Sequence, residues 1–308
     1  MKVFQNISEA KHIKNPVLTL GVYDGIHLGH QAIISQLNRI AEEIGGESVL
    51  LTFEPHPRIT LNKGADSLQL LTLEDEKTEL LKNYGLQNLI IHPFTKEFSQ
   101  LSADDFVKLL VDEIGIHSMV IGYDHHFGKD RSGDFQELSR LSKIYGFDCV
   151  KVDEIKSGDN HISSTQIRNS LLKGDLEFAK KGLNRNYSLK GTVVDGDKLG
   201  RTFGYPTANL KVEKYKLIPG NGVYVVKVFI GDEVFKGLLS IGTRPTVTNT
   251  NEKRVEVYIL DFDHDIYGKE IKLEFFKKLR DDQKFDSVEE LIRQMDVDKS
   301  AAEKFNFD

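Results

Sequence analysis

Glycines and histidines are concentrated in one short segment near the start of the chain. Residues 21–30 read Gly-Val-Tyr-Asp-Gly-Ile-His-Leu-Gly-His and separate an apolar run from a helical pattern. Free backbone N–H groups and the positive end of a helix dipole meet at such a junction, and glycine lets an anion approach the backbone closely. His27 and His30 stand three apart, so both imidazoles lean to one side of a helix start. They could stabilise charge that grows on a triphosphate attacked at its α-phosphorus.

Two other interpretations of the histidine pair stay open. The pair could bind a metal, although the Glu of an H-E-x-x-H helix is absent, or it could consist of surface histidines. The spacing G-x-x-x-x-G-K-[ST] is absent, so the segment is not a P-loop. Besides the histidines, the residues expected to bind phosphate here are Gly21, Tyr23, Asp24, Gly25 and Gly29.

Hydroxyl side chains precede a second helical pattern. Ser163, Ser164 and Thr165 stand just before Arg168. Hydroxyls at a helix start are most often N-caps. Combined with the histidine segment they predict a second phosphate clamp, in which Arg168 supplies a bidentate cation. Between the two motifs, residues 122–134 form a polar, glycine-rich segment that is either an active-site loop or a solvent loop.

A third cluster lies in the second half of the chain. Its members expected to bind nucleotide are Gly196, Lys198, Gly200, Arg201 and Gly204. Thr207 and Asn209 follow at alternate positions, which point to one face of an extended backbone. Their hydroxyl and amide oxygens suit Mg²⁺, although a turn rich in glycine and asparagine is the alternative. In the later run 254–260, alternation alone places Glu256 on a solvated strand face.

The elements that position these residues differ between the two halves. In the first half, short apolar runs alternate with segments of helical period, which predicts a parallel sheet covered on both faces. Strands are expected at 17–21, 48–53, 89–92, 118–122 and 149–152, and helices at 31–44, 73–83 and 102–114. Ser102 is the expected N-cap of the last of these helices. In such sheets the ligand lies at the carboxyl ends of the strands.

Closely spaced strand signals without long helices between them dominate the second half. They predict a compact antiparallel barrel or sandwich. Strands are expected at 187–194, 222–230, 234–241, 255–262 and 270–276, followed by a helix at 287–295. The polar segment 182–186 is the best boundary, which gives domains of residues 1–184 and 185–308.

Composition restricts the class of protein. The chain has 308 residues, of which 39% are hydrophobic and 29% charged, as in packed globular domains. A net charge of -6 argues against general binding of nucleic acid or anionic membranes. The single cysteine, Cys149, excludes an intrachain disulfide and a cysteine-based zinc site and is expected to be a buried thiol. No apolar run is long enough to span a bilayer and the start lacks a secretory signal, so a cytoplasmic location is expected.

Six motifs in order resemble the bifunctional bacterial riboflavin kinase/FAD synthetase family. They are residues 21–30, 52–57, 122–134, 162–168, 206–209 and 254–267. The resemblance covers essentially the whole chain. It implies an N-terminal FMN adenylyltransferase in a nucleotidyltransferase-type, Rossmann-like α/β domain and a C-terminal riboflavin kinase in a small antiparallel β-barrel with a terminal helix. Riboflavin would become FMN and then FAD, with ATP, riboflavin, FMN and Mg²⁺ as the partners.

The resemblance also implies roles for individual residues. In the kinase, Glu256 would be the catalytic base, Thr207 and Asn209 would hold Mg²⁺, and residues 196–204 would cover the phosphates of ATP. In the adenylyltransferase, the residues at the ATP phosphates would be His27, His30, Ser164, Thr165 and Arg168, with Asp124 also contacting the nucleotide. The flavin ring is expected near Phe53, Pro55, Pro57 and Phe127.

Several residues depart from the usual family pattern, among them Leu238, Leu239 and Ser240, where smaller residues are usual. Tyr23 and Tyr205 stand where the family usually has Phe, and His125 replaces a commonly aromatic, apolar residue. Two alternatives stay open at this point. An enzyme with only one active half, most plausibly the kinase, would have the same fold, and so would a sensor that binds flavin or nucleotide without catalysis.

Overall fold

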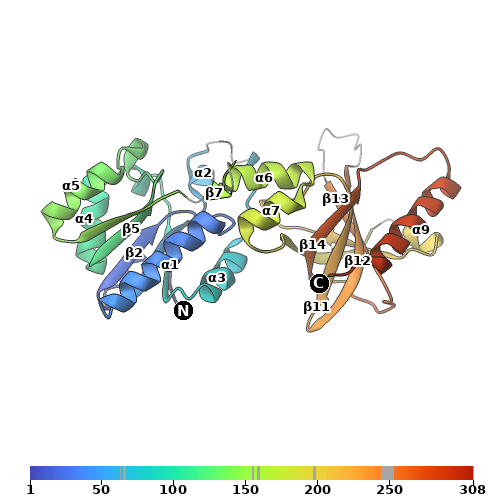
Figure 1. The fold of residues 1–308 in the computed structure, drawn as a ribbon, viewed down its shortest axis with the longest axis horizontal. Coiled ribbons are helices and arrows are strands. Elements are labelled where there is room, and N and C mark those ends of the chain that lie inside the picture. Colours follow the sequence, from blue (N-terminus) through green and yellow to red (C-terminus); the bar gives the residue numbers. More distant parts are fainter. Residues whose placement is uncertain are drawn as a thin grey trace. The chain divides into compact units, whose positions relative to one another are not determined.

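The chain forms two compact units, Met1–Ser164 and Thr165–Asp308. The computed structural model describes residues 1–62, 64, 67–154, 156–157, 160–196, 199–243 and 253–307. Each unit has a sheet of its own, a parallel one in the first and a closed antiparallel barrel in the second (Figure 1). The two-domain α/β-plus-barrel architecture predicted from the sequence is confirmed.

Six parallel strands make up the sheet of the first unit. They are β1 (Lys2–Phe4), β2 (Pro16–Leu20), β3 (Glu47–Glu54), β4 (Asn88–Pro93), β5 (Ser118–Gly122) and β6 (Asp148–Val152). Their order is β1-β4-β3-β2-β5-β6, so the chain reverses its direction of strand addition at β2. A crevice for ligands is expected at the carboxyl end of such a strand. The segment 21–30 begins where β2 ends.

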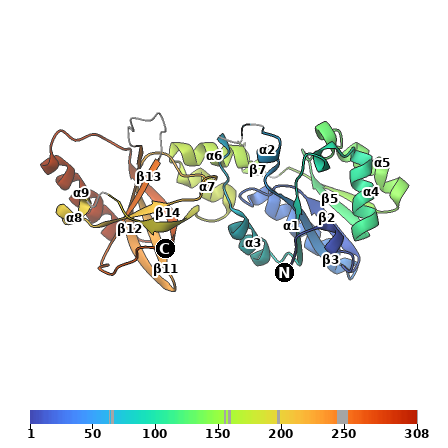
Figure 2. The ribbon, with the colours of Figure 1, turned by 180° about the vertical axis from the view of Figure 1, so that it is seen from behind.

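Helices cover both faces of this sheet (Figures 1 and 2). On one face α1 (Leu28–Glu43) and α3 (Glu74–Asn83) contribute Ile34, Leu37 and Leu81 to a buried apolar cluster. On the other face α4 (Ala103–Ile114) and α5 (Phe135–Tyr145) contribute to a second cluster. The shorter helical elements are η1 (Ile7–Glu9), α2 (Pro57–Thr60), η3 (Phe98–Gln100) and η4 (Lys129–Arg131). The two-residue strands β7 (Lys156–Ser157) and β8 (Asn160–His161) pair with each other.

The helix signals in the sequence were partly correct in this unit. Ser102 is the N-cap of α4, since its side chain accepts a hydrogen bond from the backbone N–H of Asp105. Helix α1 begins at Leu28 rather than at the expected residue 31, because His27 is its N-cap. Helix α5 was not predicted, although Asp134 caps it by accepting from the backbone N–H of Glu137. The polar segment before it was interpreted only as a loop.

The barrel of the second unit is closed. Its strands are β9 (Ser188–Val194), β10 (Thr207–Lys211), β11 (Gly222–Ile230), β12 (Glu233–Thr243), β13 (Lys253–Ile259) and β14 (Glu270–Arg280). Their order is β10-β13-β12-β11-β14-β9, and the pairing of β9 with β10 closes the ring. The short α8 (Leu199–Thr202) precedes β10. The expected strand 255–262 ends early at Ile259, because Asp261 has a left-handed φ of 54°.

The terminal helix is longer than expected. Helix α9 (Val288–Lys304) continues past Met295, where the sequence pattern ended. Ala302, in its last turn, is fully buried in the apolar cluster formed with Val225 and Leu260 of the barrel unit. Tertiary packing therefore stabilises a last turn that the apolar periodicity did not reveal.

Two helices precede the barrel, α6 (Ser164–Lys173) and α7 (Leu176–Leu183). Helix α7 packs against β14, and the N–H of Gly220 donates to the backbone oxygen of Leu171 at 2.9 Å. For this reason the division between the compact units lies at Ser164/Thr165, ahead of the polar segment 182–186.

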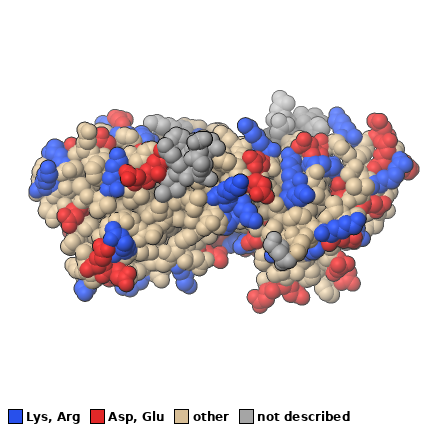
Figure 3. All heavy atoms as spheres, in the orientation of Figure 1, with Lys and Arg blue, Asp and Glu red and all other residues tan. Residues whose placement is uncertain are grey.

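Charged side chains of both signs are intermixed on the face shown in Figure 3. None of the helices in the described ranges is long and apolar enough to cross a membrane. Cys149 was expected to be buried, but it is only half-buried at the rim of a core cluster, with its sulfur 3.6 Å from Ser142 Oγ.

Candidate active sites

The histidine segment forms a stack of rings beyond the end of β2. The rings of His27 and His30 are 3.8 Å apart between centroids, and Tyr23 stacks on His30 at 4.5 Å. The hydroxyl of Tyr23 is 2.9 Å from Thr19 Oγ1, which fixes the outer ring of the stack. Gly21, with φ 148°, turns the chain away from the strand in a conformation that a Cβ would strain. The two histidines expected to act together therefore lie together.

Hydrogen bonds hold the loop between β2 and α1. The carboxylate of Asp24 accepts from the backbone N–H groups of Leu71 and Thr72, at 2.8 and 3.0 Å. The N–H of Gly25 donates to Thr72 Oγ1 at 3.0 Å, and Ser164 Oγ donates to the backbone oxygen of Asp24 at 2.8 Å. Asp24 thus anchors the loop. Gly29 lies in the first turn of α1.

Two imidazoles of this site, those of His30 and His125, are neutral at physiological pH. Burial, together with the neighbouring His27, Lys77 and His125, holds the pKa of His30 well below its usual value of 6.5. Burial likewise lowers the pKa of His125 to about 4. Nδ1 of His30 and Nε2 of His125 are shielded from solvent and have no hydrogen-bond partner among the described residues. Such nitrogens can donate to a phosphate oxygen or accept a proton, but they add no fixed positive charge.

The hydroxyl cluster lies at the start of α6. Ser164 is its first residue and belongs to the first compact unit, whereas Thr165 and Arg168 belong to the second. Arg168 Nη1 donates to Thr165 Oγ1 at 3.4 Å. Ser163 is half-buried just before the helix.

The residues expected near the flavin ring are partly enclosed. Phe53 is 9% exposed and Phe127 is 4% exposed. Phe53 packs against Phe94 and Phe98, with centroids 5.4 and 5.6 Å apart. Pro55 is exposed, and Pro57 is half-buried at the start of α2. The aromatic surface near the carboxyl ends of β3 and β4 therefore includes Phe94 and Phe98, which the sequence analysis missed.

The loop 122–134 is folded back on itself. Phe127 and Gly133 form an antiparallel bridge, and a Cβ on Gly133 would lie 2.6 Å from the ring of Phe127. Asp124 is exposed at the turn after β5. Tyr123, beside it, is exposed as well.

In the barrel, three oxygen-bearing side chains converge on adjacent strands. Asn209 of β10 is paired with Glu256 of β13, and Thr207 is paired with Tyr258. Thr207 Oγ1 lies 3.4 Å from Glu256 Oε2, and Arg254 Nη1 lies 3.0 Å from Glu256 Oε1. Glu256 is half-buried with a side chain that is 24% exposed, while its neighbours Val255 and Val257 point into the barrel core. The carboxylate is thus held in place and reachable from solvent.

The glycine-rich segment before β10 touches the same residues. A Cβ on Gly196 would lie 2.1 Å from the amide nitrogen of Asn209, so only glycine permits this close approach. A Cβ on Gly200 would lie 2.2 Å from the backbone oxygen of Tyr205. Gly204, with φ 81°, follows α8. Lys198 lies outside the described residues, and Arg201 is placed only by its backbone in α8.

The donor set at Thr207, Asn209 and Glu256 fits Mg²⁺. A hydroxyl, an amide and a carboxylate are hard oxygen ligands, which Mg²⁺ prefers, with nucleotide phosphates filling its other positions. No group of three or more His, Cys, Asp or Glu side chains suited to a metal ion occurs in the described part of the chain.

Comparison with known proteins gives a match for each half. A family model described as FAD synthetase matches residues 9–166, and one described as riboflavin kinase matches residues 183–306. A bifunctional riboflavin kinase/FMN adenylyltransferase of Listeria monocytogenes is 38% identical over 291 residues, 94% of this chain and 92% of its own length. The chain belongs to the bifunctional riboflavin kinase/FMN adenylyltransferase family.

A second curated relative agrees with this assignment, and a solved structure shares the fold. The bifunctional riboflavin kinase/FMN adenylyltransferase of Bacillus subtilis is 35% identical, covering 94% of this chain and 92% of its own length. A crystal structure described as a macrolide-efflux protein from Streptococcus pneumoniae superposes with a TM-score of 0.90 and 31% identity, covering 99% of each chain. The fold found here is therefore shared over its full length by a relative.

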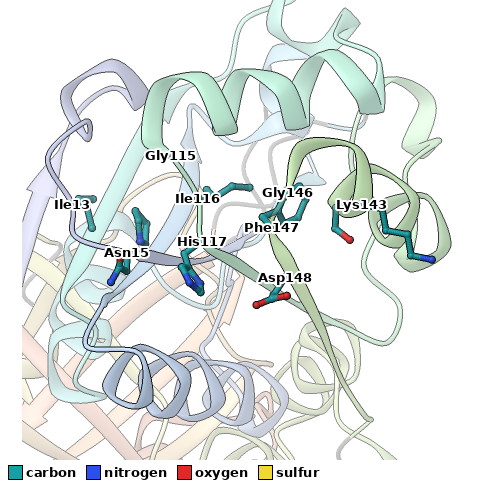
Figure 4. A pocket seen from close by; sticks show the side chains of 11 residues that line it. Ile13, Asn15, Gly115, Ile116, His117, Lys143, Gly146, Phe147 and Asp148 are labelled. Carbon is teal, nitrogen blue, oxygen red and sulfur yellow. The ribbon is translucent and has the colours of Figure 1, made fainter.

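A hollow of about 490 Å³ lies elsewhere on the first unit (Figure 4). Its lining includes Pro16, His117 and Asp148, which lie at or next to the amino ends of β2, β5 and β6. The histidine segment lies at the opposite, carboxyl edge of the same sheet. The hollow is thus separate from the site where this fold binds its ligand.

Two charged residues of these sites were missed by the sequence analysis. Arg254 was included only as the start of a strand, and Lys77 was not singled out. Lys77 lies in α3, 7% exposed, with Nζ 3.5 Å from Thr52 Oγ1 at the end of β3. Lys77 stands four residues before Leu81 on the same helix face, and the burial of both is known only from the fold.

Proposed function

We propose that the two activities of this bifunctional enzyme use separate sites, with FMN adenylyltransferase residues in 1–184 and riboflavin kinase residues in 185–308. Separate family models match residues 9–166 and 183–306, which supports two distinct sites. Helix α6 would serve the first activity through Ser164 and Thr165 at its start, while the rest of the helix packs with the barrel unit. Both sites use ATP, but a different phosphorus is attacked in each.

In the kinase step, Glu256 takes the proton from the terminal ribityl hydroxyl of riboflavin as that oxygen attacks the γ-phosphorus of ATP. The bond from this phosphorus to the bridging oxygen breaks, and ADP leaves. Its half-buried carboxylate faces Thr207 and is held by Arg254, so one oxygen is oriented before substrate arrives. Thr207 and Asn209 would hold Mg²⁺, which when bound neutralises charge on the ATP phosphates. The segment 196–204, with Lys198 and Arg201, would cover those phosphates.

In the adenylyltransferase step, a phosphate oxygen of FMN attacks the α-phosphorus of ATP and pyrophosphate leaves. The nucleophile is already an anion, so no base has to remove a proton from it. His27 and His30 would donate N–H groups to the phosphates, and Arg168 would add a bidentate cation. Catalysis then depends on positioning and on stabilising the charge that grows on the leaving group.

For the flavin ring, we propose a surface that includes Pro55, Pro57, Phe94 and Phe98, with the buried Phe53 and Phe127 supporting it from below. The half-buried rings of Phe94 and Phe98, with the exposed Pro55 and the half-buried Pro57, give the apolar face that a planar isoalloxazine needs. The expected environment is the cytoplasm, and the net charge of -6 gives no reason to expect nucleic acid as a partner.

The convergence of Thr207, Asn209 and Glu256 on adjacent strands is the observation that carries the kinase assignment. The test is to incubate the protein with riboflavin, ATP and Mg²⁺ and to separate riboflavin, FMN and FAD by chromatography. FAD is the expected final product. FMN alone would mean that only the kinase half is active, and no product would leave a binding function without catalysis.

A further inference from the structure

A buried lysine lies beside the stacked histidines of the first unit. In the described part of residues 1–164, Lys77 is the only lysine or arginine that is buried. Its Nζ lies 3.5 Å from Thr52 Oγ1 at the carboxyl end of β3, the strand next to β2. His30 lies within electrostatic range of this ammonium group. Lys77 therefore reaches the edge of the sheet from which the histidine segment starts.

His30 and His125 provide no fixed positive charge, so the phosphates need cations beyond these two histidines and the proposed Arg168. ATP brings a triphosphate, and pyrophosphate gains negative charge as it leaves. His30 and His125 are neutral because burial keeps their pKa values low. Asp24 adds a buried negative charge close by. A lysine at this edge offsets that charge and stabilises the departing phosphates.

The surroundings of Lys77 are suited to this task. Burial lowers the pKa of Lys77, whereas the carboxylates of Asp24, Glu54 and Glu74 oppose that effect and favour the ammonium form. Asp24 accepts hydrogen bonds from two backbone N–H groups, and Glu54 and Glu74 are exposed to solvent. A polyanion that enters the site would favour the charged lysine further.

We propose that Lys77 is a phosphate-binding residue of the adenylyltransferase site, with Nζ donating to the β- and γ-phosphates that leave as pyrophosphate. This inference rests on the proposed adenylyltransferase function. The bond that forms joins an FMN phosphate oxygen to the α-phosphorus, and the bond that breaks releases pyrophosphate with its electron pair. Lys77 stabilises that leaving group without giving up a proton in the step.

The competing role for Lys77 is structural, as a counter-ion for Asp24 alone. The two roles differ in what a substitution changes. If Lys77 is only a counter-ion, its substitution should lower the stability of the first unit and should weaken the binding of all its ligands to a similar extent. A phosphate-binding residue would affect pyrophosphate and ATP while leaving the affinity for FMN nearly unchanged.

The test compares K77M, K77R and K82M with the parent protein. Lys82 is an exposed lysine on the same helix, so K82M is a matched control. FAD formation from FMN and ATP, the affinity for magnesium pyrophosphate by calorimetry, and FMN formation by the kinase half are measured for each. Thermal unfolding shows whether each variant is folded.

K77M is expected to lower kcat/KM for ATP in FAD formation by about 100-fold, the effect of removing one charge-stabilising donor. It should weaken pyrophosphate binding, with parental kinase activity and an unchanged KM for FMN. K77R should keep most of the FAD-forming activity, and K82M should match the parent in all three measurements. The inference would be overturned if a folded K77M bound pyrophosphate with the affinity of the parent. It would also be overturned if K77M and K77R lost FAD formation to the same extent.

The proposed function is tested by the parent protein alone. If the parent makes no FAD from FMN and ATP, the adenylyltransferase assignment fails. Calorimetry with pyrophosphate still decides separately whether Lys77 binds phosphate.

Discussion

Replacing Glu256 with glutamine separates the two activities most directly. The substitution keeps the shape of the side chain. Its amide oxygen can still accept a hydrogen bond from Arg254 Nη1, which lies 3.0 Å from Oε1 of Glu256 in the parent protein. What is lost is the ability to take a proton from the ribityl hydroxyl. General-base catalysis contributes about 10² to 10⁴ in rate, which corresponds to about 3 to 5 kcal/mol of activation free energy.

The stability of E256Q should change far less than its kinase rate. The Arg254 and Glu256 side chains are 34% and 24% exposed, and ion pairs with such access to solvent contribute about 0.2 to 1 kcal/mol. The free energy of unfolding, measured with urea, should therefore stay within about 1 kcal/mol of the parent value. A fall in rate by two orders of magnitude or more then reflects chemistry and not unfolding.

The barrel offers a matched control for this experiment. Glu274 of β14 pairs with Lys272 two residues away, at 3.7 Å, and its side chain is 27% exposed. E274Q should lose an ion pair of the same kind and keep the parental rate of FMN formation. Both variants are assayed for FMN formation from riboflavin and for FAD formation from supplied FMN.

Two results would refute the reasoning. If E256Q makes FMN at nearly the parental rate, Glu256 is not the base. If E256Q loses FAD formation from supplied FMN as strongly as it loses FMN formation, the two activities do not use separate sites.

Further predictions concern each unit in turn. H30A should stop the pathway at FMN, because it removes an imidazole stacked at 3.8 Å on His27, and FAD formation at the parental rate would remove His30 from its proposed role. D298N should lower the free energy of unfolding of the barrel unit in urea by about 2 kcal/mol, because it removes the charge partner of Arg280 at a carboxylate only 7% exposed. H125F should flatten the pH dependence of stability between pH 4 and 6.5. His125 has a pKa of about 4 in the folded chain against an ordinary value of 6.5, so the unfolded chain binds the proton first and stability falls as pH drops through this window. Urea midpoints at pH 4.5 and 7 that differ as much in H125F as in the parent would contradict this.

Local sequence signals predicted the elements of both units well where an apolar pattern and a cap agree. Ser102 shows this, since it caps α4 at the expected residue. Where packing between distant segments decides, the prediction failed. Helix α9 continues to Lys304 because Ala302 is buried against the barrel, a contact that no periodicity within the helix reveals.

The candidate sites were predictable to the extent that their residues are adjacent in sequence. The stack of His27 on His30 follows from a spacing of three at a helix start. Lys77 was missed because its surroundings come from Thr52 and Asp24, which lie in other segments. In a sequence, a lysine among glutamates on a helix has the pattern of a solvated face, and only the tertiary fold shows that it is buried.

The two proposed sites differ in a way that follows from their nucleophiles. A riboflavin hydroxyl must lose a proton before it attacks, and the barrel unit offers the half-buried, oriented carboxylate of Glu256. An FMN phosphate is an anion already, so a carboxylate base would only repel it. In the first unit the buried carboxylate of Asp24 accepts hydrogen bonds from backbone N–H groups instead, and the groups proposed for the phosphates include the neutral imidazole of His30 and the ammonium of Lys77. The chemistry of each nucleophile thus explains why a base is proposed in the barrel unit and a phosphate-binding cation in the first unit.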